Sequence, residues 1–158
     1  MHITRVKLVN FRNIADLEFS PEPSVNLIGG PNGAGKTSII EAIFFGCTAR
    51  SFRSASDEVL LRKGADVCRI EIDGVVNERE TTVEIAWGRA HKRQIKVDGI
   101  KLTRVADLFD YFHAVSYIPE DTELAYGAPS VRRHLLDLYL SQADRSYLND
   151  LFEYNRIL

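Results

Sequence analysis

Residues 30–37 read Gly30-Pro31-Asn32-Gly33-Ala34-Gly35-Lys36-Thr37, a glycine-rich run that ends in Lys-Thr. It fits the pattern G-x-x-x-x-G-K-[ST] at every fixed position. Glycines allow backbone N–H groups to turn toward phosphate oxygens without a Cβ in the way, and the helix that follows directs the positive end of its dipole at the same anion. The stretch therefore predicts a P-loop that binds a nucleoside triphosphate.

The residues at the end of the loop have distinct expected roles. Lys36 reaches the β- and γ-phosphates, the Thr37 hydroxyl ligates Mg²⁺, and Ser38 is counted with the nucleotide-binding residues. An apolar strand at 24–28 precedes the loop and a helix from 36 to about 45 follows it, which is the context that a P-loop requires. The alternative is a glycine-rich turn that ends a strand, and the full pattern in this context disfavours it.

The rest of the chain divides into β-rich runs followed by a helical region. Alternating apolar and polar residues predict strands at 2–10, 17–19, 67–76, 81–87 and 93–97, and Asp98-Gly99 predicts a type I′ turn into 100–102. A further core strand is expected at 114–118, and helices from Pro129 onward. The expected fold is α/β: a P-loop lobe over 1–128 with an antiparallel meander (about 65–103) inserted in its core sheet, then a helical lobe that starts within 129–158.

Composition sets limits on function. The net charge is −2 with a pI near 6.1, so any binding of nucleic acid must come from a local basic patch. Cys47 and Cys68 match no metal-ligand spacing and are interpreted as reduced thiols of a cytosolic protein. No signal-peptide pattern and no membrane-spanning apolar stretch is visible, so no membrane partner is expected.

A P-loop alone does not select among kinases, GTPases and ATPases. A Walker B strand ending in a catalytic carboxylate is not found; the nearest run, 115–121, is interrupted by Ser116 and Pro119. A Leu-Ser-Gly-Gly-like signature and an Asn-Lys-x-Asp base-reading motif are also not found. The chain ends at Leu158 within an apolar helical pattern, which we interpret as the boundary of a longer protein that carries these parts and a coiled-coil arm.

Segments along nearly the whole chain resemble the RecF recombination-repair proteins, part of the SMC-like branch of ABC-type ATPases. The similar segments, in order, are 7–13 (KLVNFRN), 32–37 (NGAGKT) with 41–43 (EAI), 49–53 (ARSFR), 118–121 (IPED), and 127–133 (GAPSVRR) with 136–137 (LD). Ala34 stands where the family often has Gln and Ala128 where a small polar residue is common. Neither difference has an obvious consequence, since position 34 contributes backbone only.

This resemblance implies a two-lobed head that forms a homodimer around two ATP molecules with Mg²⁺. It implies ATP-dependent binding of DNA at single-/double-strand junctions, together with RecR and RecO, in repair of single-strand gaps in the cytoplasm. Because the expected carboxylate and signature lie outside 1–158, the chain alone is expected to bind ATP without hydrolysing it.

The resemblance also implies roles for polar residues outside the P-loop. Arg12 and Asn13 would reach the nucleotide phosphates, although an exposed loop pair is the alternative. Arg50 and Arg53 would approach nucleotide or DNA, or belong to a solvated loop. Glu120 stands where related heads carry a glutamine that positions Mg²⁺ or water; the alternative is a turn acid.

Basic residues around the expected hairpin tip form a candidate surface for DNA phosphates, although charged hairpin tips are commonly only solvated. The residues proposed for this contact are Arg89, Lys92 and Arg93.

Three other classes remain open. Another SMC-like or ABC-type head would share the P-loop and Arg12 but need not carry the segment 127–137. A small nucleotide kinase or GTPase predicts a lid or base-reading motif, which is not visible. A nucleotide-free scaffold predicts no binding of ATP analogues at millimolar levels.

Overall fold

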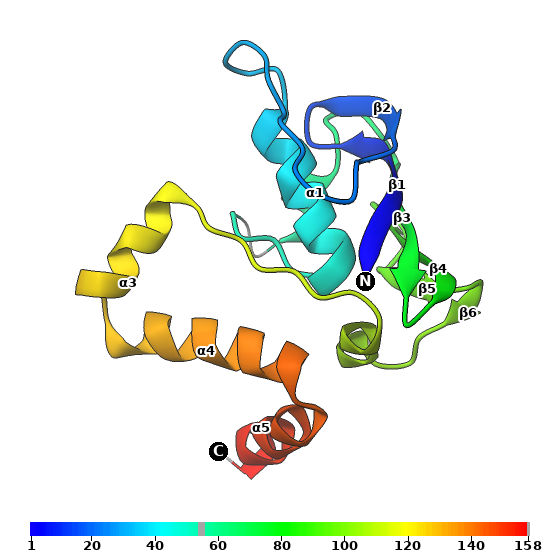
Figure 1. Ribbon diagram of the computed structural model, residues 1–158. Coiled ribbons are helices and arrows are strands. Elements are labelled where there is room, and N and C mark those ends of the chain that lie inside the picture. Colours follow the sequence, from blue (N-terminus) through cyan, green and yellow to red (C-terminus); the bar gives the residue numbers. More distant parts are fainter. Residues whose placement is uncertain (54–55, 158) are drawn as a thin grey trace. The chain divides into compact units, whose positions relative to one another are not determined.

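The computed structural model describes residues 1–53 and 56–157, with the side chains at 120, 122, 123 and 125 outside the description. The chain forms two compact units, Met1–Phe112 and His113–Leu158. The predicted α/β class is confirmed, since strands and helices both form and antiparallel strands make the sheet (Figure 1).

The first unit is built on one antiparallel sheet of six strands in the order β2-β1-β3-β4-β5-β6. Its strands are β1 (His2–Phe11), β2 (Ile14–Phe19), β3 (Val67–Val76), β4 (Arg79–Gly88), β5 (Gln94–Val97) and β6 (Ile100–Lys101). The register places Val6 opposite Ile72 and Ile72 opposite Val83, and all three side chains are fully buried. Alternation along each strand therefore gives one apolar face and one charged face.

Helix α1 (Lys36–Thr48) packs on the apolar face, against β1, β3 and β4 (Figure 1). Gly46 permits the approach, because a Cβ at this position would overlap the side chain of Ile72. Phe45 lies 6.5 Å from Phe11 and 5.2 Å from Trp87 between ring centroids. This aromatic cluster fixes the helix, and with it the P-loop, on the sheet.

Two predicted strands do not form. Residues 24–28 are irregular, with Val25 and Leu27 86% and 96% exposed, and the Asn26 side chain accepts a bond from the Glu22 amide and donates one to its carbonyl. A strand needs a neighbour for its backbone hydrogen bonds, and in the described part of the chain none lies beside this segment. The predicted antiparallel meander continues the sheet of β1 and β2, because β3 pairs directly with β1.

The predicted strand 114–118 is also wrong. Its backbone groups bond to side chains instead: Ala114 N–H donates to Gln142 at 2.8 Å, and Ser116 exchanges bonds with the Tyr139 hydroxyl. The segment therefore groups with the helices of the second unit, which begins at His113, whereas the sequence placed the helical lobe from 129.

The second unit contains η2 (Pro119–Thr122), α3 (Glu123–Tyr126), α4 (Pro129–Ala143) and α5 (Arg145–Ile157). Pro129 starts α4, as predicted, and Asp144 caps α5 by accepting the Ser146 amide at 2.7 Å. Tyr147 donates its hydroxyl to Asp137 at 2.6 Å, which raises the pKa of Tyr147. No described helix is long and apolar enough to cross a membrane.

Candidate nucleotide-binding site

The loop at 30–37 has the backbone conformation that its glycines allow. Gly30, Gly33 and Gly35 have φ values of 149°, 82° and 96°. At Gly35 a Cβ would also lie 3.1 Å from the side-chain amide of Asn13, so only glycine fits there. The predicted P-loop residues Pro31, Asn32 and Ala34 lie between these glycines and are exposed.

Helix α1 begins at Lys36, directly after Gly35, so the last two residues of the motif lie in its first turn. This turn contains no acidic residue. The amino end of the helix therefore keeps its partial positive charge for an anion. The Lys36 ammonium group donates to the carbonyls of Gly30 and Pro31, both at 2.8 Å, so it lies inside the curve of the loop. In a P-loop, the lysine at this point of the motif reaches the terminal phosphates of the bound nucleotide.

Thr37 is at the start of α1, and its hydroxyl oxygen is a ligand type that Mg²⁺ accepts. The described residues contain no cluster of three or more His, Cys, Asp or Glu side chains that could hold a metal by itself. A magnesium ion here would therefore take one ligand from Thr37 and others from nucleotide phosphates and water.

Asn13 and Arg12 follow β1 and border the P-loop. Asn13 donates its side-chain amide to the carbonyl of Gly33 at 3.1 Å. Arg12 forms two bonds to the carboxylate of Glu41, from Nε at 3.0 Å and from Nη2 at 2.7 Å. The alternative of a merely solvated loop pair does not hold for Arg12, because its guanidinium group is committed to a buried acid.

A hollow of about 590 Å³ lies beside this group. Its lining includes cations from three segments of the chain, together with Asn13 and Ser38; the cations are Arg12, Arg53, Arg62 and Lys63. Ser38 is buried, with 7% of its surface exposed. The structure thus brings Arg53 to the hollow beside Arg12 and Asn13. Arg50 is not part of this lining, and it forms no ion pair with the described residues.

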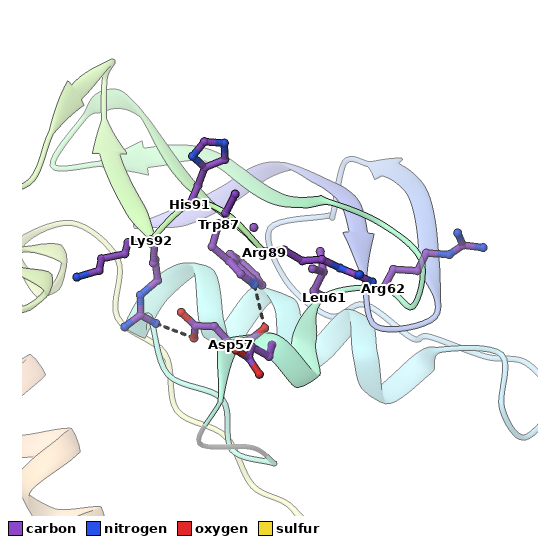
Figure 2. Close-up of a pocket in the computed structure, with 11 residues that line it drawn as sticks. Asp57, Leu61, Arg62, Trp87, Arg89, His91 and Lys92 are labelled. Carbon is purple, nitrogen blue, oxygen red and sulfur yellow. Dashed lines mark hydrogen bonds and ion pairs between the residues drawn. The ribbon is translucent and has the colours of Figure 1, made fainter.

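A second hollow of about 720 Å³ lies where the β4–β5 connection faces α2 (Asp57–Leu60). Trp87 donates its indole N–H to the Asp57 carbonyl at 2.9 Å. Figure 2 shows Arg62, His91 and Lys92 extending outward around Trp87 in different directions. Together with Arg89, which is also exposed, these basic groups form the rim of the hollow. The two hollows share Leu61 and Arg62 in their linings.

Arg93 does not belong to the exposed part of this rim. It donates to the Ala49 carbonyl at 2.8 Å, pairs with Asp57 at 3.3 Å, and its guanidinium carbon lies 5.5 Å from the centre of the Phe45 ring. These contacts join the β4–β5 connection to α1 and α2. Arg93 therefore has a structural role, which differs from the DNA contact proposed from the sequence.

The charged face of the sheet carries mutually neutralised groups. Arg5 pairs with Glu18, Glu71 and Asp73, and Arg69 pairs with Glu71 and Glu84. The hydrogen bond from Arg5, with a second from Lys7, lowers the pKa of Glu18. Within the described ranges, by contrast, no ion pair forms at Arg62, Lys63, Arg89 or Lys92.

The sequence interpretation assigned no role to Glu41, which the structure buries and pairs with Arg12. The sequence feature that indicates this pairing is a single carboxylate among Ile39, Ile40, Ile43 and Phe44 on α1. A carboxylate that is buried at such a position requires a partner. Glu120 has no described side chain, so its predicted role is outside the described residues. Asp121 accepts the Ile118 amide at 2.8 Å, as a turn acid does.

Comparison with known proteins agrees with this geometry. The family model described as AAA domain matches residues 5–127. The DNA replication and repair protein RecF of Halalkalibacterium halodurans is 38% identical over 159 residues, which covers 100% of this chain and 42% of that protein. The RecF protein of Salinibacter ruber is 38% identical over 157 residues, covering 99% of this chain and 38% of that protein.

Solved structures give the same result. A structure described as the recombination mediator protein RecF-ATP in the RecFOR pathway has a TM-score of 0.91 and 30% identity, covering 98% of this chain and 42% of that one. The SMC head domain from Thermotoga maritima, at 24% identity and a TM-score of 0.55, covers 70% of this chain and 41% of that one and shares the fold. The chain spans about two-fifths of the length of the curated relatives it matches. It belongs to the AAA domain family and is similar over its whole length to the RecF proteins.

Proposed function

We propose that this chain is the nucleotide-binding part of an ATP-dependent DNA-binding protein of recombinational repair and replication-gap repair. The observation that carries the proposal is the P-loop: glycines in left-handed conformations, Lys36 inside the curve, and an acid-free helix start lie in one segment. Similarity across 98% of the chain to a RecF structure described with ATP supports ATP as the nucleotide.

The P-loop and its neighbours would each contribute different contacts to the nucleotide. Backbone N–H groups of residues 30 and 32–38 and the charge of Lys36 bind the phosphates, Thr37 supplies one Mg²⁺ ligand, and Arg12 and Asn13 line the adjoining wall. Hydrolysis of this class also needs a carboxylate that positions water. We expect the chain alone to bind ATP without hydrolysing it, because no Walker B acid was found in its sequence.

The proposed partners follow from the resemblance to RecF proteins. They are DNA at single-/double-strand junctions, a second copy of the head bound in an ATP-dependent way, and RecR and RecO; the proposed location is the cytoplasm. For DNA, rim cations of the second hollow that form no ion pair with the described residues support a contact surface at Arg62, Arg89 and Lys92 (Figure 2). Arg53 remains a candidate for contact with nucleotide.

The proposal is tested by replacing the P-loop lysine. Lys36→Ala removes the side-chain cation aimed at the β- and γ-phosphates, and with it a charge-assisted hydrogen bond. We expect the affinity for Mg-ATP, measured by calorimetry, to fall by an order of magnitude or more. Lys7→Ala, which removes the same charge from the opposite face of the sheet, is the matched control. Equal affinity in Lys36→Ala and wild type would refute the P-loop as the binding site.

A further inference from the structure

Glu41 is a fully buried carboxylate on α1, the helix that begins with Lys36 and Thr37. Its Oε1 accepts from Arg12 Nη2 at 2.7 Å and from the Ser51 hydroxyl at 2.5 Å, and its Oε2 accepts from Arg12 Nε at 3.0 Å. Arg53 Nη1 lies 3.7 Å from Oε2. A buried carboxylate is costly unless it is paired, so these donors are required wherever Glu41 is present.

The groups that Glu41 holds come from two loops that border the 590 Å³ hollow beside Arg12 and Asn13. Arg12 and Arg53 both line this hollow, together with Ser38 of α1. The two arginines differ in freedom: 18% of the Arg12 side chain is exposed, against 48% for Arg53. Glu41 thus fixes one arginine firmly and approaches a second more loosely.

The backbone at Arg12 shows that its position is imposed. Its φ of 54° lies in the left-handed region, which disfavours a residue with a long side chain. The Arg12 amide donates to the Leu60 carbonyl at 2.7 Å, and Nη1 donates to the Val59 carbonyl at 3.3 Å. A conformation of this kind persists only where surrounding contacts hold it, and the bidentate bond to Glu41 is the strongest of these contacts.

We propose that Glu41 is a positioning residue for nucleotide binding. By its two-point bond it sets the plane of the Arg12 guanidinium group on the wall of the hollow, where that cation faces the triphosphate of a nucleotide held by the P-loop. Glu41 acts through Arg12, and its own carboxylate is enclosed. This inference rests on the proposed function, since it assigns a role within the same site.

The test uses variants that keep or remove the geometry of the bond. Glu41→Asp keeps the charge but is shorter by one methylene group, so it holds one N–H of Arg12 in place of two. We expect its affinity for Mg-ATP to fall on the order of tenfold, which corresponds to about 1.4 kcal/mol. Glu41→Gln loses the charge and should lose more affinity. Asp73→Asn, which alters an arginine-paired acid on the opposite face of the sheet, should bind ATP as wild type does.

A double-mutant cycle separates positioning from simple stabilisation. In an Arg12→Lys background the two-point bond to Glu41 is already absent, because lysine lacks the planar guanidinium group. If Glu41 acts through Arg12, Glu41→Asp should therefore cause no further loss of affinity for Mg-ATP in that background. Thermal unfolding of each variant is measured in parallel, since a purely structural role would lower the melting temperature and leave the affinity of the folded chain unchanged.

Each outcome is decisive. If Glu41→Gln does not fold, Glu41→Asp carries the test. Wild-type affinity in Glu41→Asp, with binding still lost in Lys36→Ala, would overturn the role of Glu41 and leave the proposed function in place. Binding of ATP that does not depend on Lys36, or no binding by the wild-type chain, would overturn both.

Discussion

The two buried thiols, Cys47 and Cys68, make the stability of the folded chain depend on pH. Burial raises the pKa of Cys47 to about 12, and it also raises the pKa of Cys68, where the charge of Asp57 adds to the effect. The neutral thiol is therefore favoured in the folded chain. In the unfolded chain a thiol has a pKa of about 8.5, so the two states bind the same protons at neutral pH and differ above it.

The free energy of unfolding should consequently fall as pH rises. The stabilisation from the raised thiol pKa values is fully present below about pH 8.5 and is lost as pH approaches the folded pKa of Cys47, by up to about 1.4 kcal/mol per pH unit for each thiol. Urea unfolding at pH 8, 9 and 10 measures this slope. The double variant Cys47→Ala/Cys68→Ala should show a shallower slope, and parallel slopes in the two proteins would contradict the assignment.

Single residues differ in how far sequence predicts their roles. The positive φ values of the P-loop glycines were predictable because the spacing of the motif is local and each glycine has a physical requirement. The partners of Arg12 and Arg93 were not, because the acids they bind lie 29 and 36 positions away along the chain. Which cation forms an ion pair depends on how helix, sheet and loop pack, and no local pattern contains that information.

Strands, too, were predictable where the sequence signal is local and not where they depend on a distant partner. Alternation identified the hairpins, and Asp98 and Gly99 have φ values of 51° and 78°, as the predicted type I′ turn requires. The runs 24–28 and 114–118 have the composition of strands but lack a neighbouring strand among the described residues. Strand formation depends on the pairing partner as much as on propensity, which is why composition alone failed there.

The β4–β5 connection yields a prediction for DNA binding. Arg89→Ala/Lys92→Ala removes two rim cations that have no carboxylate partner in the described chain. If these groups bind phosphates, affinity for junction DNA should fall, and the slope of log affinity against log salt should flatten by about 0.9 for each phosphate of duplex DNA that the variant no longer neutralises. Fluorescence anisotropy at several salt concentrations measures both quantities.

The control for this experiment comes from β4, the strand that precedes the β4–β5 connection. Arg79→Ala removes an exposed cation at the opposite end of β4 and should leave the salt slope unchanged. An unchanged slope in Arg89→Ala/Lys92→Ala would place the DNA surface elsewhere, with Arg50 and Arg53 as the next candidates. Arg93→Ala is unsuitable, because it would leave Asp57 without its ion pair and remove the contact with Phe45.

At the scale of the whole molecule, a slightly acidic chain carries a local basic rim. The net charge of −2 does not indicate this arrangement. On the sheet face acids pair with cations, whereas Arg89 and Lys92 form no ion pair within the described part of the chain. The α/β class was predictable from the order of β-rich and helical runs around the P-loop. The division after Phe112 was not, because it depends on bonds from 114 and 116 to side chains of α4.

In the proposed complex ATP binds at residues 30–38, with Arg12 and Asn13 on the adjoining wall. An amide NMR titration of the chain with Mg-ATP tests this placement most directly, because each backbone N–H reports its own surroundings. We expect shifts confined to the amides of residues 30 and 32–38, of Arg12 and Asn13 and of the neighbouring loop at 50–53, with unchanged signals at the Asn77–Glu78 turn of the sheet. Signals that shift elsewhere while those of Gly33, Gly35 and Lys36 stay in place at millimolar ATP would contradict it.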